Sequence, residues 1–242
     1  MLYYRHMATL IFDIETIGEE FDALDETTQE MLTKWIKKES ANDKEYRAEL
    51  EDIKNGLGFS PLTGEIVAIG ILDGERNQGA VWYQSPNTKE KEMQDGNMKF
   101  KPATEKEMLD EFWRVAQSYD TFVTFNGRGF DAPFLMVRSA VHGIRPSKDL
   151  MSNRYATSQR AGATHIDLLD QLSFYGAVRR KGSLHLWSRA FGIPSPKAGG
   201  VTGDDVQYLF KEKRFLDIAR YNVGDLVATR ELYDRWQKYI RM

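Results

Sequence analysis

Apolar residues along the chain gather in short runs that are separated by polar turns. Four runs are rich in β-branched and aromatic residues and predict buried strands: 8–15 (ATLIFDIE), 65–72 (EIVAIGIL), 79–84 (GAVWYQ) and 120–125 (DTFVTF). The polar stretch DGERNQ lies between the second and third runs and predicts a turn.

Helical periodicity first appears in residues 105–118, where apolar residues recur every three or four positions. Thr104 and Glu107 have the spacing of a capping box at its start. Further segments complete the pattern: a helix from about 131 to 142, a strand end passing into a helix at 165–176, and mainly helical stretches at 183–193 and 204–240. This order predicts an α/β fold with a ribonuclease-H-like mixed five-stranded sheet flanked by helices.

Residues 18–58 do not belong to a minimal version of that fold, since a tight hairpin would be enough to join the first two strands. The segment is charge-rich and is expected to form two helices. It is either a solvated helical insertion that decorates the fold or a cap that selects strand ends at a site.

Composition limits the possible classes of protein. The 242 residues are 41% hydrophobic, enough for one α/β domain spanning 1–242 with the helical insertion. No apolar run approaches the roughly 18 residues of a membrane span, and the start does not have the pattern of a signal peptide. There are no cysteines, which excludes disulfides and thiolate metal sites, and a cytoplasmic protein is expected.

The charge balance bears on nucleic-acid binding. With 36 acidic and 33 basic residues the net charge is −3, which argues against a protein that coats DNA through charge alone. An enzyme that gathers carboxylates around metal ions and has only a local basic groove remains compatible with it.

Three clusters of polar residues are candidates for chemistry. Asp13 and Glu15 are two apart on an expected strand, so they project from the same face and can offer oxygen ligands to a hard divalent cation. The ordinary alternative is a strand end that emerges into water with two charges.

Asp131 follows a strand and the loop NGRGF. It is either a helix-start residue with Pro133 in the first turn, or a site residue at the end of a strand.

The third cluster is Tyr221 and Asp225, which are four apart and therefore on one face of a helix. A core tyrosine with a surface aspartate is the ordinary alternative. A glycine such as Gly224 destabilises a helix by about 1 kcal/mol relative to alanine, and a close contact with a neighbouring element is a usual reason for a glycine at such a position. That contact would bring Asp225 against Asp13.

In combination these clusters resemble a known family. DIET at 13–16, NxxxFD from Asn126 to Asp131, and YxxxD from Tyr221 to Asp225 resemble the three exonuclease motifs of the DEDD 3′–5′ exonuclease superfamily. The tyrosine is typical of the DEDDy branch, because the histidine of the other branch would stand at Arg220. The chain is most similar to stand-alone predicted exonucleases related to the proofreading domain of family-B DNA polymerases. SPLTGEIVAIGI, EKEMLDEFW, HIDLLDQLSFYG and FGIPSP also fit, and the resemblance spans about residues 8–237.

The resemblance implies a site for two divalent cations, Mg²⁺ or Mn²⁺. Asp13 would bridge the ions, Glu15 and Asp225 would complete the site of the ion that activates the water, and Asp131 would hold the second ion, partly through water. Tyr221 would orient the attacking water. The expected reaction is hydrolysis of the terminal phosphodiester with release of a nucleoside 5′-monophosphate.

Substrate contacts are expected around this site. Asn126 would reach the nucleotide or its phosphate, and the backbone at Thr16 and Ile17 would meet the 3′ end. Phe130 would pack under the terminal base or sugar, unless it is a core aromatic that closes the start of the helix.

Two basic stretches, 145–162 and 179–182, are candidates for gripping a strand, with Tyr155 and Tyr175 as stacking partners. Solvated loops are the alternative. His165 and His185 show no metal-ligand spacing and are expected to be structural or exposed.

The function expected from these observations is a metal-dependent 3′–5′ exonuclease that acts on single-stranded ends, with DNA preferred by family analogy. The partners would be single-stranded DNA or RNA 3′ ends, with a polymerase or repair machinery in trans. Two alternatives are an exonuclease that trims RNA 3′ ends and a catalytically silent nucleic-acid binding module.

Overall fold

The computed structural model describes residues 8–195 and 203–241. Its centre is a sheet of seven strands in the order β4-β5-β3-β2-β1-β6-β7. The strands are β1 Thr9–Gly18, β2 Gly64–Asp73, β3 Gly79–Tyr83, β4 Met93–Asp95, β5 Met98–Pro102, β6 Thr121–Thr124 and β7 Thr164–Asp167. β1 pairs antiparallel with β2 and parallel with β6, so the sheet is mixed as expected.

The expected count of five strands was wrong, because β4 and β5 add an edge next to β3. β5 runs parallel to β3 and buries only Met98 and Phe100, with exposed Lys99 between them. Two apolar residues within a polar segment are too few to predict a strand from the sequence alone, because this strand is defined by its pairing with β3.

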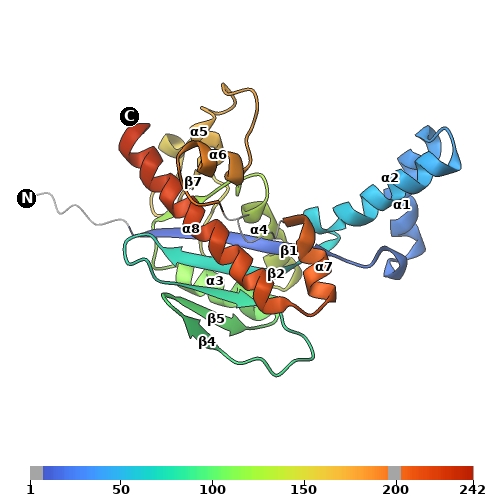
Figure 1. Ribbon diagram of the computed structural model, residues 1–242, viewed down its shortest axis with the longest axis horizontal. Helices are drawn as coiled ribbons and strands as arrows, with labels where there is room; N and C mark the ends of the chain where they lie inside the picture. The colour runs from blue at the N-terminus through green and yellow to red at the C-terminus, as the bar shows by residue number, and fades with distance from the viewer. Residues whose placement is uncertain (1–7, 196–202, 242) are drawn as a thin grey trace, which may run out of the picture.

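Helices cover both faces of the sheet. They are α1 Glu26–Glu39, α2 Asp43–Gly56, α3 Glu105–Ala116, α4 Asp131–Val141, α5 Leu168–Leu172, α6 Leu184–Ala190, α7 Val206–Lys211 and α8 Phe215–Tyr239. The long α8 crosses one face, and α3 lies on the other (Figure 1). The expected capping box is confirmed at the start of α3, where Thr104 and Glu107 each bond the other's backbone N–H. No helix in the described ranges is long and apolar enough to cross a membrane.

The alternation of β1 assigns its side chains to two separate cores. Ile11 packs in the core beneath α8 together with Leu226, whereas Phe12 packs in the core of α3 and α4. Side chains alternate along a strand, so Asp13 and Glu15 lie on the same face as Ile11 and point toward α8.

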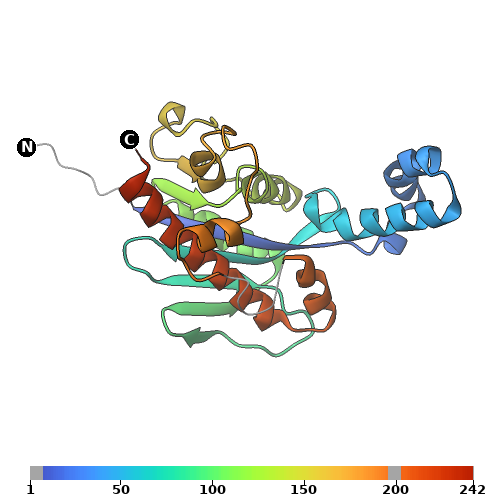
Figure 2. The same cartoon turned by 45° about the horizontal axis from the view of Figure 1, so that its top comes forward.

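The segment between β1 and β2 forms the two expected helices, which project from the sheet as an arm (Figures 1 and 2). Asp25 caps α1 and Asn42 caps α2 through side-chain acceptors. None of the α2 side chains is buried, as expected for an insertion that is solvated over most of its length. The base of the arm, η2 (Leu57–Phe59), instead contacts β1, where the Thr16 hydroxyl donates to the Gly58 carbonyl at 2.7 Å.

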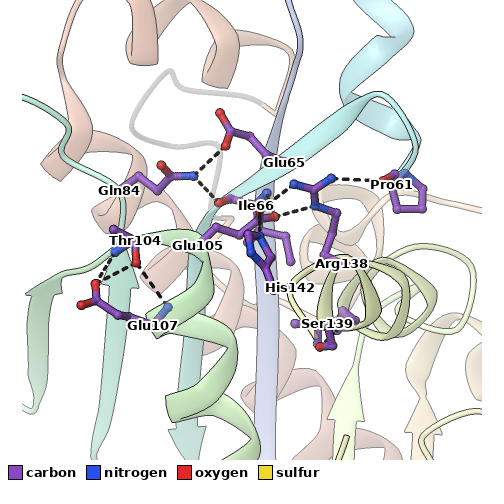
Figure 3. Close-up of polar contacts among 11 residues, drawn as sticks. Pro61, Glu65, Ile66, Gln84, Thr104, Glu105, Glu107, Arg138, Ser139 and His142 are labelled. Carbon is purple, nitrogen blue, oxygen red and sulfur yellow. Dashed lines mark hydrogen bonds and ion pairs between the residues drawn. The ribbon is translucent and has the colours of Figure 1, made fainter. Parts of the chain in front are cut away.

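A buried carboxylate, Glu105, ties α3 to its surroundings (Figure 3). Its Oε1 accepts from the Ile66 backbone N–H at 2.8 Å and from Arg138 Nε at 2.8 Å. Its Oε2 accepts from Arg138 Nη2 at 2.7 Å and lies 2.7 Å from His142 Nε2. Both oxygens of this carboxylate are therefore satisfied, and α3, α4 and β2 are joined through it.

Candidate active site

The site lies at the point along β1 where its pairing with β6 ends. β6 pairs with β1 only at residues 9–11, and beyond that point the Ile14 backbone N–H donates to Asp131 Oδ1 at 3.0 Å. Asp131 is the first residue of α4, but the N-cap position belongs to Phe130, which makes no side-chain cap. The side chain of Asp131 therefore connects α4 to the central strand, which goes beyond the ordinary helix-start interpretation.

Three carboxylates from β1 and α8 converge at this point. Asp13, Glu15 and Asp225 each offer one oxygen, and these oxygens all lie within 4.8 Å of one another. Glu15 is buried, and the other two are partly exposed. The expectation that α8 brings Asp225 against Asp13 agrees with this geometry. Asp131 is not one of the three, yet it lies close enough to raise the pKa of Asp13.

The cluster holds negative charge in a poorly solvated place. Burial raises the pKa of Asp13 well above its ordinary value, and repulsion from Asp131, Glu15 and Asp225 adds to the effect. Burial and the Asp225 charge likewise raise the pKa of Glu15. Burial also raises the pKa of Asp131 to about 7.

The donor set fits a divalent cation. In the part of the chain that the structure describes, no lysine or arginine forms an ion pair with Asp13, Glu15 or Asp131. Clustered carboxylates without a cationic partner are costly to bury, and hard divalent ions such as Mg²⁺ and Mn²⁺ take carboxylate oxygens as ligands. A bound cation would therefore offset the repulsion that the protein leaves in place.

Tyr221 stands beside the carboxylates, one helical turn before Asp225. Burial raises the pKa of its phenol, and the charges of Asp225, Glu15 and Asp13 raise it further, as does a hydrogen bond with Asp225. The phenol therefore stays protonated at neutral pH and remains a hydrogen-bond donor.

Asn222, which the motif analysis did not single out, also belongs to the site. It is fully buried, and its Nδ2 donates to Asp13 Oδ2 at 2.8 Å and to Glu15 Oε1 at 3.4 Å. The sequence offered one signal for Asn222: it is an amide that lies between the candidate residues Tyr221 and Asp225 in an amphipathic helix.

Asn126 lies at the end of β6, outside the carboxylate cluster. Its φ of 64° is left-handed, and its backbone N–H donates to Asp167 Oδ1 at 2.9 Å. Asp167 also accepts from the Arg128 N–H at 3.0 Å, so this buried residue, missed by the sequence analysis, shapes the loop that leads to Asp131. Asn126 lines a cavity of about 290 Å³ together with Arg128 and Lys181.

Thr16 and Ile17 lie at a second cavity, of about 470 Å³, between β1, the base of the arm and α7. Phe59 lines the same cavity and is 63% exposed. Phe130 packs on Phe134 with ring centroids 5.4 Å apart, and lies edge-on to Phe59 at 6.4 Å. Phe130 is thus part of the packing at the start of α4, and it also neighbours the exposed ring of Phe59. The sequence analysis did not single out Phe59.

The basic stretch 145–162 is anchored to the fold. Lys148 Nζ donates to the Gly162 carbonyl at 2.8 Å, and Arg154 forms an ion pair with Asp170. The rings of Tyr155 and Tyr175 lie 4.7 Å apart, and the Arg154 guanidinium is 5.8 Å from the Tyr175 centroid. Of the charges proposed to grip a strand, that of Arg154 is already partly neutralised.

The two candidate structural histidines make local contacts. His165 is buried between Thr124 Oγ1 at 2.9 Å and the Leu150 carbonyl at 3.0 Å, and burial lowers its pKa to about 4. His185 Nδ1 lies 2.6 Å from Ser195 Oγ. His165 is thus a neutral, structural residue.

Comparison with known proteins places most of the chain in a family. Residues 65–241 match a family described as "Predicted 3'-5' exonuclease related to the exonuclease domain of PolB". The matched range contains Asp131, Tyr221 and Asp225, whereas Asp13 and Glu15 precede it.

Individual relatives are DNA polymerases. The chain is 30% identical to one from Desulfurococcus sp. (strain Tok) over 148 residues, 54% of this chain and 18% of the relative. It is 27% identical to one from Thermococcus sp. (strain 9oN-7) over 188 residues, 70% of this chain and 22% of the relative. The chain thus spans about a fifth of the length of these relatives.

A solved structure confirms the fold. The family B DNA polymerase of the archaeon Pyrobaculum calidifontis superposes with a TM-score of 0.55 at 16% identity, covering 96% of this chain and 24% of the polymerase. The family match covers well over half of the residues, and the fold agrees with it. The chain therefore belongs to the family of predicted 3′–5′ exonucleases related to the exonuclease domain of PolB.

Proposed function

We propose that this protein is a two-metal-ion 3′–5′ exonuclease that removes nucleoside 5′-monophosphates from single-stranded nucleic acid, preferentially DNA. The observation that carries the proposal is the convergence of Asp13, Glu15 and Asp225, with the protonated Tyr221 beside them. Mg²⁺ or Mn²⁺, when bound, supplies Lewis-acid activation of the phosphate and of the attacking water.

Each side chain has a role that follows from its place. Asp13, Glu15 and Asp225 would hold one cation, and Asp131, whose carboxylate accepts from the Ile14 N–H, would serve the second. The Tyr221 hydroxyl, which forms a hydrogen bond with Asp225, would orient the attacking water.

The cavity at Thr16 and Ile17 is the proposed place for the 3′-terminal nucleotide. It adjoins the C-terminal half of β1, directly after Glu15, and Phe59 offers an exposed ring to a base. The preference for DNA rests on the polymerases that the chain resembles, and a polymerase or repair machinery in trans is the proposed partner.

The decisive experiment uses 5′-labelled single-stranded DNA and RNA of matched sequence, with Mg²⁺, Mn²⁺ or EDTA, and with the Asp13→Ala variant in parallel. We expect a metal-dependent ladder that shortens from the 3′ end, faster on DNA and absent in the variant. A faster RNA ladder would favour 3′-end trimming of RNA. Tight binding without cleavage would favour a silent binding module, and full activity of Asp13→Ala would refute the proposed site.

The basic stretches 145–162 and 179–182 are proposed to contact the strand backbone. Replacing Arg145 and Arg160 by glutamine should weaken binding and lower the salt dependence of the binding constant by about one per lost phosphate contact. An unchanged slope in a fluorescence-anisotropy titration would show that the first stretch is a solvated loop.

A further inference from the structure

We propose that Asn222 is a positioning residue of this site, and that it fixes Asp13 and Glu15 in the arrangement that binds the cations. The inference rests on the proposed function, because it assigns Asn222 a task at the same carboxylates. It also identifies Gly70 as the residue that makes room for Asn222.

The hydrogen bonds of Asn222 are directed at both carboxylates of β1. One nitrogen, Nδ2, lies 2.8 Å from Asp13 Oδ2 and 3.4 Å from Glu15 Oε1. The side chain is fully buried. A donor shared by two neighbouring carboxylates reduces their repulsion and restricts both to one orientation before a cation arrives.

The other end of the same amide indicates that stability is not the reason for its presence. Asn222 Oδ1 is buried and has no hydrogen-bond partner among the described residues. An unsatisfied buried acceptor costs about 1–3 kcal/mol, whereas an apolar side chain of the same shape at this position would avoid that cost. The donor nitrogen is the part of Asn222 that the site uses.

The neighbouring strand is shaped to admit this side chain. Gly70 of β2 is the direct register partner of Asp13. A Cβ at Gly70 would lie 1.8 Å from Asn222 Oδ1 and 2.7 Å from Leu226 Cδ1. Even one methyl group at this position would therefore displace the amide or α8, which also carries Tyr221 and Asp225. The glycine, the carboxylate and the amide form one interlocking contact between β2, β1 and α8.

The task is that of a residue that orients metal ligands without touching the metal. Removing such partners typically weakens metal affinity or activity by about 10–100-fold. The amide does not titrate, so it can hold the carboxylates in the same way across the pH range in which they are ionised.

The test compares Asn222→Leu with a matched control on the same helix, Thr229→Val. Thr229 is also buried on α8, one turn beyond Asp225. Binding of Mn²⁺ alone is measured by electron paramagnetic resonance and calorimetry, and thermal unfolding is followed in EDTA. We expect Asn222→Leu to unfold in EDTA at or above the wild-type temperature and to bind Mn²⁺ about tenfold more weakly, or worse. We expect Thr229→Val to bind Mn²⁺ as the wild type does.

A folded Asn222→Leu protein with wild-type Mn²⁺ affinity would overturn the proposal. Should that variant not fold, Asn222→Ala, which leaves a gap and no clash, is measured in its place with the same expectation. In a double-mutant cycle Gly70→Ala should destabilise the wild type more than it destabilises Asn222→Ala. Equal costs would show that the two residues do not interlock.

Cleavage assays separate this inference from the proposed function. In an active enzyme, Asn222→Leu should raise the Mn²⁺ concentration needed for half-maximal rate and leave the KM for the strand unchanged. A wild-type protein that binds Mn²⁺ but cleaves no strand would refute the proposed function and leave the positioning role of Asn222 in place.

Discussion

A single buried carboxylate and a cluster of carboxylates lie against the same sheet in opposite environments. Glu105, in the interface of α3, α4 and β2, receives hydrogen bonds from Arg138, from the Ile66 N–H and from His142. Burial alone would raise the pKa of Glu105, but these hydrogen bonds outweigh it and hold the pKa below its ordinary value. Asp13 and Glu15, which face α8, have raised pKa values.

The difference shows that burial of an acid does not by itself indicate a functional site. A carboxylate surrounded by donors and a guanidinium is complete within the protein and links structural elements. Carboxylates that face one another repel, and this repulsion lowers stability unless a cation offsets it. The second arrangement is the one that indicates function.

The largest expected effect is the loss of cleavage in Asp13→Asn. This change removes the carboxylate central to the cluster, so the cleavage rate should fall about a thousandfold or more. The free energy of unfolding in EDTA should stay the same or rise, because like-charge repulsion is reduced. Gel assays and denaturant titrations measure the two quantities. A large loss of stability in EDTA would show that Asp13, like Glu105, stabilises the fold.

Glu105→Gln should have the opposite profile. It leaves Arg138 without its buried partner charge, so the free energy of unfolding should fall by about 3 kcal/mol. Cleavage per folded molecule should be nearly unchanged at low temperature. The control is Glu111→Gln, which breaks the more exposed pair with Arg114 at 2.6 Å and should cost less than about 1 kcal/mol. Equal losses of unfolding free energy in the two variants would show that Glu105 has no special structural role.

Tyr221→Phe should act on cleavage alone. It removes the hydroxyl that donates near the carboxylates, and the rate should fall by roughly 10–100-fold, at or below the lower end of what a single positioned proton donor contributes. Mn²⁺ affinity should change little, because the phenol is not proposed as a ligand. A drop in Mn²⁺ affinity as large as that of Asn222→Leu would mean that Tyr221 also orients the carboxylates.

The smallest expected effect is a pH dependence of stability that comes from Glu105. Its folded pKa is lower than the ordinary value of 4.5, so its contribution to stability is fully present above that value. The contribution is lost as the pH falls through the folded pKa. The difference in unfolding free energy between the wild type and Glu105→Gln should therefore shrink from pH 7 toward pH 3. A constant difference over this range would show that the ionised form is not what stabilises the fold.

Local patterns in the sequence determined most of the secondary structure and indicated the acids of the candidate site. The alternation in β1 places Asp13 and Glu15 on one face, the i, i+4 spacing in α8 aligns Tyr221 with Asp225, and the capping box starts α3. These features depend on residues a few positions apart, and backbone geometry alone sets their relative directions.

Tertiary structure alone decided the remaining parts. The pairing of β5 with β3 and the link from Asp131 to Ile14 each require two segments to meet across the fold. The fit of Asn222 over Gly70 joins residues that are far apart in the chain. Such contacts depend on shape and on unsatisfied donors in three dimensions, and they leave no periodic trace in a single sequence. The sequence alone therefore indicated the acids of the candidate site, whereas the amide that donates to two of them emerged only from the packing of α8 on the sheet.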